Sequence, residues 1–139
     1  AEGVSASAMD PAATPEAAAG DWIVACLCAQ WCGICRGWHE AFRELARDSA
    51  ALLPGARWLW VDVESQADAL GDFELENFPV LAVQQGARLL YCAALPQQAG
   101  NWRRMVQSLG ALDDEQARRW AQQLQALGLD LRRLRDETD

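Results

Sequence analysis

Residues 22–35 read WIVACLCAQWCGIC, and this stretch decides the fold. Its first part, from Trp22 to Ala29, is an almost unbroken apolar run, which is typical of a central strand buried on both faces. From Ile34 to Ala50 the pattern changes, because apolar residues recur at helical spacing with charged residues opposite them. The stretch therefore predicts a buried strand that leads into an amphipathic helix.

The elements that follow predict a mixed sheet. Strands are expected at 57–64, 80–84 and 88–93, and helices at 65–74 and 97–109. The last two strands flank a Gln85-Gly86 turn, which is a hairpin signal. A strand–helix–strand crossover followed by an antiparallel hairpin gives an α/β fold with a mixed central sheet flanked by helices.

The two ends of the chain differ from this central part. Residues 1–20 have little periodicity and predict an N-terminal arm with a short helix that starts at Thr14-Pro15. In the last part, Asp113 and Gln116 have capping-box spacing. An apolar stripe then follows, made of Trp120, Leu124, Leu127, Leu131 and Leu134. We expect residues 21–110 to form the domain and 111–139 to form a C-terminal helical extension packed on it.

Composition and charge exclude several classes of protein. A length of 139 residues fits one domain, and the net charge of −8 argues against a nucleic-acid partner. No apolar run reaches the roughly 18–20 residues that cross a bilayer, so no membrane partner is expected. The first residues lack the features of a signal peptide. This predicts a cytoplasmic monomer, or a periplasmic one if an upstream signal has been removed.

Cys32 and Cys35 are separated by two residues and lie where the predicted helix begins. A helix N-terminus presents unpaired N–H groups and the positive end of its dipole, which favours a thiolate over a thiol. In Cys-x-x-Cys sites a cysteine pKa falls from about 8.5 to roughly 3.5–7.5. We therefore expect Cys32 to attack a disulfide and Cys35 to resolve the mixed disulfide. Half of a zinc site and two unreactive buried thiols are the alternatives for this spacing.

At this point the sequence resembles the thioredoxin family over residues 21–109, through the segments 29–35 (AQWCGIC) and 78–81 (FPVL). The resemblance implies a thioredoxin-like fold in which a cis Phe78–Pro79 bond faces the sulfur atoms. It also implies that Trp31 lies beside the nucleophile. The sequence departs from the family pattern at several positions. Ile34 replaces the usual proline between the cysteines, Cys26 replaces the buried acid, Trp60 stands where a lysine is common, and the helix proline expected near Glu40 is absent.

The function implied is that of a thiol–disulfide oxidoreductase, a protein-disulfide reductase that needs no cofactor. Its partners would be client proteins that contain disulfides and an upstream thiol reductant. The residues expected to dock the substrate are Trp31, Gly33, Ile34, Phe78 and Pro79. The alternative is a thioredoxin-like binding module, which uses its C-terminal helix to hold a partner and whose thiols are regulatory or incidental.

The remaining cysteines and the single histidine leave alternatives open. Cys26 and Cys28 lie two apart on a strand, so both side chains point to one face. We expect small buried side chains there; a second redox couple and a four-thiolate metal site with Cys32 and Cys35 are the alternatives. Cys92 is expected to be a core thiol. His39 is expected to be a solvated helix residue, with a role as proton acceptor for Cys35 as the alternative.

Overall fold

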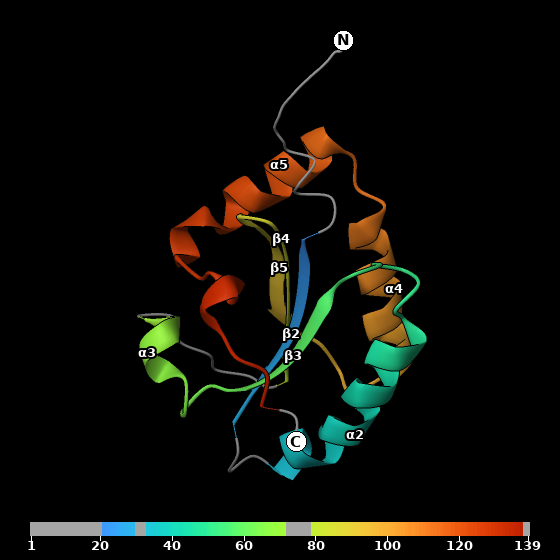
Figure 1. The fold of residues 1–139 in the computed structure, drawn as a ribbon, viewed down its shortest axis with the longest axis vertical. Coiled ribbons are helices and arrows are strands. Elements are labelled where there is room, and N and C mark those ends of the chain that lie inside the picture. The colour runs from blue at the N-terminus through green and yellow to red at the C-terminus, as the bar shows by residue number, and fades with distance from the viewer. Residues whose placement is uncertain (1–20, 30–32, 72–78, 138–139) are drawn as a thin grey trace.

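The computed structural model describes residues 21–29, 33–71 and 79–137 (Figure 1). Within these ranges one sheet has the strand order β3-β2-β4-β5. Its strands are β2 (Trp22–Cys28), β3 (Arg57–Asp62), β4 (Val80–Gln85) and β5 (Arg88–Ala94). The α-helices are α2 (Gly33–Asp48), α3 (Ala67–Leu70), α4 (Ala99–Gly110) and α5 (Asp114–Leu124). Two short 3-10 helices follow, η2 (Gln125–Leu127) and η3 (Leu131–Arg133).

Strand β2 occupies the middle of the sheet, as its apolar sequence predicts. It pairs in parallel with β3 and antiparallel with β4, and all seven of its residues are buried. Strands β4 and β5 form the expected hairpin, which turns at Gly86 with a φ of 59°. That left-handed conformation is easy for a glycine, which has no Cβ. The predicted α/β fold with a mixed sheet and flanking helices is therefore confirmed. The N-terminal arm expected at residues 1–20 lies outside the described residues.

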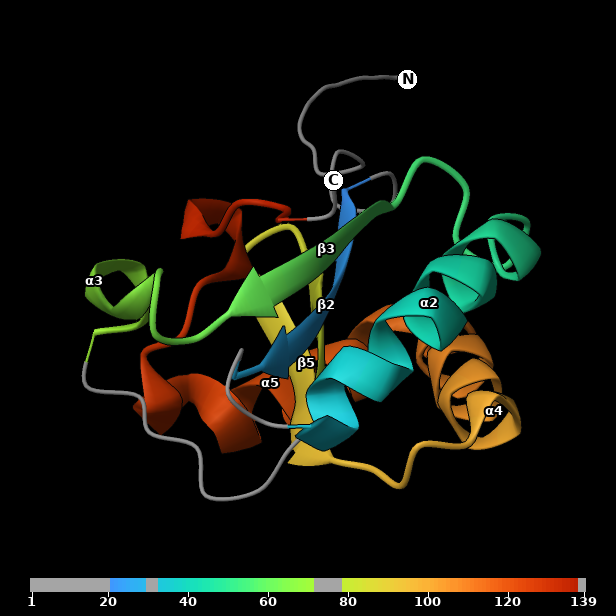
Figure 2. The same ribbon diagram turned by 90° about the horizontal axis from the view of Figure 1, so that it is seen from below.

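Alternate residues of β2 face two different layers of the molecule. Val24, Cys26 and Cys28 belong to the cluster that includes the buried side chains of α2 and α4. Ile23 and Leu27 belong to a second cluster on the opposite face. Figure 2 shows α2 and α4 together on one side of the sheet and α3 on the other. This alternation follows from the two-residue period of a strand.

The helix expected at residues 65–74 is shorter than predicted. Helix α3 spans four residues and is followed by Gly71, whose φ is 65°. The chain leaves the helical conformation at Gly71, so the expected helix does not extend to residue 74. Residues 72–78 lie outside the described part. No helix in the described ranges is both long enough and apolar enough to cross a membrane.

The C-terminal extension begins with the capping box that the sequence predicts. The Asp113 side chain accepts a hydrogen bond from the Gln116 backbone N–H, and the Gln116 side chain accepts one from the Asp113 N–H. Helix α5 packs along the edge strand β5. After η2 the chain turns at Gly128, whose φ is 67°. It then crosses the face of the sheet opposite α2 and α4, where η3 contacts β2 and β4.

The apolar stripe of this extension is divided between core and surface. Leu131 and Leu134 are 0% and 2% exposed and share a cluster with Ile23 and Leu27 of β2. Leu124 is half-buried against the same cluster. Trp120 and Leu127, in contrast, are 36% and 39% exposed. The stripe does not form a single continuous contact, because the turn at Gly128 redirects the chain.

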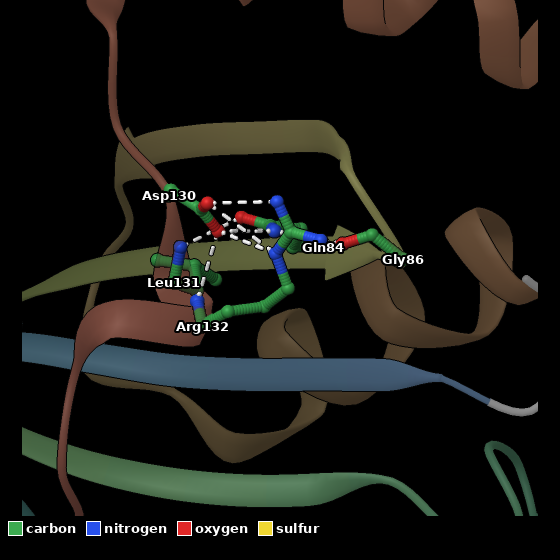
Figure 3. Close-up of polar contacts among 5 residues, drawn as sticks. All are labelled: Gln84, Gly86, Asp130, Leu131 and Arg132. Carbon is green, nitrogen blue, oxygen red and sulfur yellow. Dashed lines mark hydrogen bonds and ion pairs between the residues drawn. The ribbon is translucent and has the colours of Figure 1, made fainter.

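A buried glutamine fixes the extension to the hairpin (Figure 3). The Gln84 side-chain oxygen accepts a hydrogen bond from the Leu131 N–H at 2.7 Å. Its amide nitrogen donates to the Gly86 carbonyl and to Asp130 Oδ1, each at 2.8 Å. Asp130 is also paired with Arg132, and these bonds hold the pKa of the Asp130 carboxyl well below its usual range. A 1% exposed polar side chain therefore has its hydrogen-bonding groups satisfied.

The final described residues lie along the outer edge of β3. The Glu137 N–H donates to the Trp60 carbonyl at 2.8 Å, and the Trp60 N–H donates to Asp136 Oδ1 at 2.9 Å. The Asp62 N–H donates to the Glu137 carboxylate at 2.9 Å. Because β3 is the edge strand of the described sheet, these bonds satisfy backbone groups that would otherwise face solvent.

Candidate functional site

The candidate site lies where the central strand ends and helix α2 begins. Strand β2 ends at Cys28 and α2 starts at Gly33, which is exposed. Trp31 and Cys32 fall in the connection between them and lie outside the described residues. Cys35 belongs to the first turn of α2. The structure thus provides the strand–helix junction that the sequence predicted around the Cys-x-x-Cys motif.

The predicted docking residues are described only in part. Ile34 lies in the first turn of α2, but its side chain, like that of Cys35, is outside the described part of the chain. Phe78 and the peptide bond that precedes Pro79 are also outside it, so the cis geometry remains a prediction. Pro79 itself is buried immediately before β4, and its carbonyl accepts a hydrogen bond from the Leu95 N–H at 3.3 Å.

Sheet register places Pro79 at the same end of the sheet as the motif. Leu27 pairs with Val80 in the antiparallel β2–β4 ladder, so Pro79 is the next residue along and comes level with Cys28. The backbone therefore brings together the end of β2, the start of α2 and the start of β4. An extended substrate segment that approaches this end of the sheet would meet all three elements.

A pair of sulfur atoms lies on the α2 side of the sheet. Cys26 and Cys28 point to the same face of β2, and their Sγ atoms are 4.0 Å apart. Burial raises the pKa of the Cys26 thiol well above its ordinary value, and the indole N–H of Trp38 opposes this shift. Cys26 is therefore a protonated thiol at neutral pH.

Cys26 and Cys92 are free thiols. Either sulfur atom could be the donor in the contact between Cys26 and Cys28. The sequence pattern favours small buried side chains for Cys26 and Cys28, and both are buried, with exposed fractions of 0% and 2%.

Cys92 lies in the hairpin, away from this sulfur pair. It is partly buried against the cluster on the far face of the sheet. Burial raises the pKa of its thiol from 9.0 to about 11. The sequence predicts that Cys92 is a core thiol. In the structure it is a free thiol that packs against the core, with intermediate exposure.

His39 is half-buried, which differs from the expected solvated position. Its ring stacks on the indole of Trp60 with centroids 4.4 Å apart and an interplanar angle of 26°. Its Nε2 atom is buried and has no hydrogen-bond partner among the described residues. Helix α2 packs against this face of β3, so the His39 imidazole contacts the Trp60 indole and is not fully solvated as expected. Among the described residues, no group of three potential ligands is arranged to hold a metal ion.

The structure is similar to those of thioredoxins. It matches the germline thioredoxin Deadhead of Drosophila melanogaster with a TM-score of 0.55 and 24% identity, over 68% of this chain and 86% of the other. It matches the thioredoxin of Fasciola hepatica with a TM-score of 0.54 and 21% identity, over 64% of this chain and 81% of the other. No protein-family model and no curated protein matches the sequence.

A longer protein contains a similar unit. The zinc-bound form of human ERp44 matches with a TM-score of 0.57 and 13% identity, over 69% of this chain but only 28% of that protein. At such identities the similarity establishes the fold. The chain has a thioredoxin-like fold, and the resemblance identified from its Cys-x-x-Cys and Phe-Pro segments is confirmed at that level.

Proposed function

We propose that this protein is a thiol–disulfide oxidoreductase that reduces protein disulfides through Cys32 and Cys35. The observation that carries the proposal is the position of the motif. It follows a fully buried central strand and ends in the first turn of α2, in a thioredoxin-like fold. The α2 N-terminus supplies N–H groups and a positive dipole end, which stabilise a thiolate.

The reaction follows from ordinary thiol–disulfide exchange. The Cys32 thiolate attacks one sulfur of a client disulfide and forms a mixed disulfide, while the other client sulfur leaves as a thiolate. Cys35 then attacks Cys32, which releases the second client thiolate and leaves a Cys32–Cys35 disulfide. An upstream thiol reductant restores the dithiol. Pro79, with Trp31, Gly33, Ile34 and Phe78, forms the rim on which the client backbone docks.

Insulin reduction by dithiothreitol tests this proposal. Wild-type protein should accelerate it, and Cys32→Ser should abolish the acceleration because no nucleophile remains. Cys92→Ser is the matched control, since Cys92 lies on the other face of the sheet and should leave the rate unchanged. Full activity of Cys32→Ser would show that the nucleophile is assigned wrongly.

The direction of electron flow follows from the reduction potential of the Cys32–Cys35 couple. Equilibration against a glutathione series measures it. A value near about −270 mV suits a reductase, whereas one near about −120 mV suits an oxidant. We expect a value on the reducing side.

Two exposed apolar side chains favour a second candidate function. Trp120 and Leu127, on α5 and η2, are the large hydrophobic residues that remain exposed in the described part of the chain. A binding module would use them to hold a partner protein. Replacement of both by Ser should then abolish binding of that partner and leave insulin reduction unchanged.

A further inference from the structure

A pocket lies between the β4–β5 hairpin and the C-terminal extension. Helix α5 packs along β5 (Figure 1), and the pocket between them has a volume of about 370 Å³. This is within the range of roughly 300–1,000 Å³ that is usual for small-molecule sites. Gln85 at the hairpin turn pairs with Trp22, the first residue of β2, whereas the Cys-x-x-Cys motif follows Cys28, the last one. The pocket is therefore at the opposite end of the sheet from the proposed thiol chemistry.

The inner part of the pocket is apolar. Leu89 of β5 and Leu129 line it, and they are 6% and 7% exposed. Both belong to the cluster on the sheet face opposite α2, and Leu124 of α5, which also lines the pocket, packs against that cluster. An alkyl chain placed here would be removed from water against carbon atoms on both sides.

The outer part of the pocket carries positive charge. Arg88 of β5 and Arg118 of α5 line it, together with the amide side chains of Gln122 and Gln125. Among the described residues, no Asp or Glu is part of this lining. The whole chain has a net charge of −8, so a lining with two guanidinium groups and no carboxylate is a local exception. Such a lining attracts an anion.

The two guanidinium groups already bind one carboxylate between them. Arg88 donates to Asp114 Oδ1 at 2.9 Å, and Arg118 donates to Asp114 Oδ2 at 3.2 Å. These bonds lower the pKa of the Asp114 carboxyl. Each arginine uses one terminal nitrogen for Asp114, and a guanidinium has five N–H donors, so donors remain for a second carboxylate. Asp114 is also exposed, which lets it give way to a competing anion.

We propose that this pocket binds a small aliphatic carboxylate. Arg88 and Arg118 hold its carboxylate group, because planar guanidinium groups match the two oxygen atoms of a carboxylate. Its alkyl chain packs on Leu124 and Leu129. The ligand thus bridges the hairpin and the extension, at a site that takes no part in the reduction of disulfides.

Titration of the full-length protein with octanoate, below its micelle concentration, tests the proposal. Octanol and octylammonium are the matched probes, since they share the alkyl chain but lack the carboxylate. Octanoate should bind about tenfold more tightly than either, because bonds to a charged group contribute more than neutral ones. Calorimetry measures the affinities. Equal affinities for the three probes would overturn the proposal.

Nuclear magnetic resonance locates the bound probe. Octanoate should shift the backbone amide signals of Leu89, Gln122 and Gly128, which line the pocket. Shifts confined to residues outside this lining would overturn the assignment of the site.

A matched pair of arginine variants tests the part of the site that holds the anion. Arg118→Met keeps an apolar side chain but removes the guanidinium, so octanoate should bind about three- to tenfold more weakly. Arg119→Met is the control, because Arg119 is exposed on the same helix and does not line the pocket. It removes the same charge and should change the affinity little. Equal weakening in both variants would indicate only general attraction by charge and contradict the proposal.

Asp114→Asn tests the competition in the opposite direction. The substitution keeps the shape of the side chain and removes the carboxylate that occupies Arg88 and Arg118. Octanoate should then bind more tightly than to the wild type, and unchanged or weaker binding would contradict the proposal. The outcome is separate from that of the insulin assay, since the pocket and the motif lie at opposite ends of the sheet.

Discussion

Leu27 of β2 pairs with Val80 of β4, and this pairing brings Pro79 level with Cys28 at one end of the sheet. The relationship explains how residues more than forty positions apart in the sequence come to lie at the same end of the sheet. It depends on the backbone register of the antiparallel β2–β4 ladder. A shift of one residue would move every buried side chain of β4 to the other face.

Pro79→Ala should weaken the reduction of protein disulfides more than that of small disulfides. Pro79 is buried at the start of β4, level with Cys28, where we propose that a client backbone docks, whereas a small disulfide needs only access to a thiol. We expect kcat/KM for insulin to fall roughly tenfold or more, because precise positioning is lost. Steady-state rates with insulin and with a small aromatic disulfide measure the difference.

The control for this prediction is Pro96→Ala. Pro96 is exposed after β5, and its carbonyl, which accepts a bond from the Trp102 indole, is kept in the variant. Equal losses for insulin and for the small disulfide would indicate a general structural effect and contradict the docking role.

The parts of the fold with a strong periodic pattern could be predicted from the sequence. The buried strand at 22–28, the amphipathic helix after it, the hairpin and the Asp113 capping box all appear where their patterns place them. Each depends on local chemistry: an unbroken apolar run, helical spacing, a glycine turn or a cap. The location of the Cys-x-x-Cys motif at a strand–helix junction follows from the same signals.

The features that the sequence could not predict depend on contacts between distant segments. Nothing near Trp60 indicates that Glu137 would pair with its backbone, or that His39 would stack on its ring. Likewise, Gln84 has the sequence character of a strand residue, and its bonds to Asp130 and Leu131 appear only when the extension folds back. Local periodicity contains no information about such pairings.

The stability of the protein should fall at alkaline pH because of Cys92. Burial raises the pKa of its thiol from 9.0 to about 11, so the folded state holds this proton more tightly than the unfolded state. The resulting stabilisation is complete below the unfolded pKa and is lost as pH rises through the folded pKa. The loss is at most roughly 2–3 kcal/mol, since one pKa unit corresponds to about 1.4 kcal/mol.

Urea unfolding at about pH 8 and about pH 11 measures this loss. Cys92→Ala should lose less stability than the wild type between the two values, because the titrating thiol is gone. Tyr91, whose pKa is also raised by burial, is present in both proteins and contributes to both curves. Identical losses in wild type and variant would rule out Cys92 as a source of the pH dependence.

Gln84→Leu should destabilise the fold by leaving the buried Leu131 N–H without its partner. The leucine keeps a similar volume but cannot accept from the Leu131 N–H or donate to the Gly86 carbonyl and Asp130. A buried unsatisfied polar group costs about 1–3 kcal/mol. The urea midpoint should fall accordingly, whereas exposed Gln123→Ala on α5 should change it little. A Gln84→Leu midpoint equal to that of the wild type would show that the hydrogen bonds do not hold the extension.

The two leucines Leu131 and Leu127 provide a sharp test of what the C-terminal extension does. Both lie on the apolar stripe predicted from the sequence, but Leu131 is fully buried and Leu127 is 39% exposed. Removal of a buried leucine side chain costs about 2–5 kcal/mol, because it loses apolar contacts and leaves a cavity. An exposed leucine loses little of either.

Leu131→Ala should therefore lower the urea midpoint strongly, and Leu127→Ala should leave it nearly unchanged. Because Leu131 lies on the face of the sheet opposite α2, reduction of insulin by the folded variant should stay close to the wild-type rate. Equal and small effects of both substitutions would mean that the extension contributes little to the core. In that case the stripe would serve a partner, and the binding-module function would gain support over the enzyme.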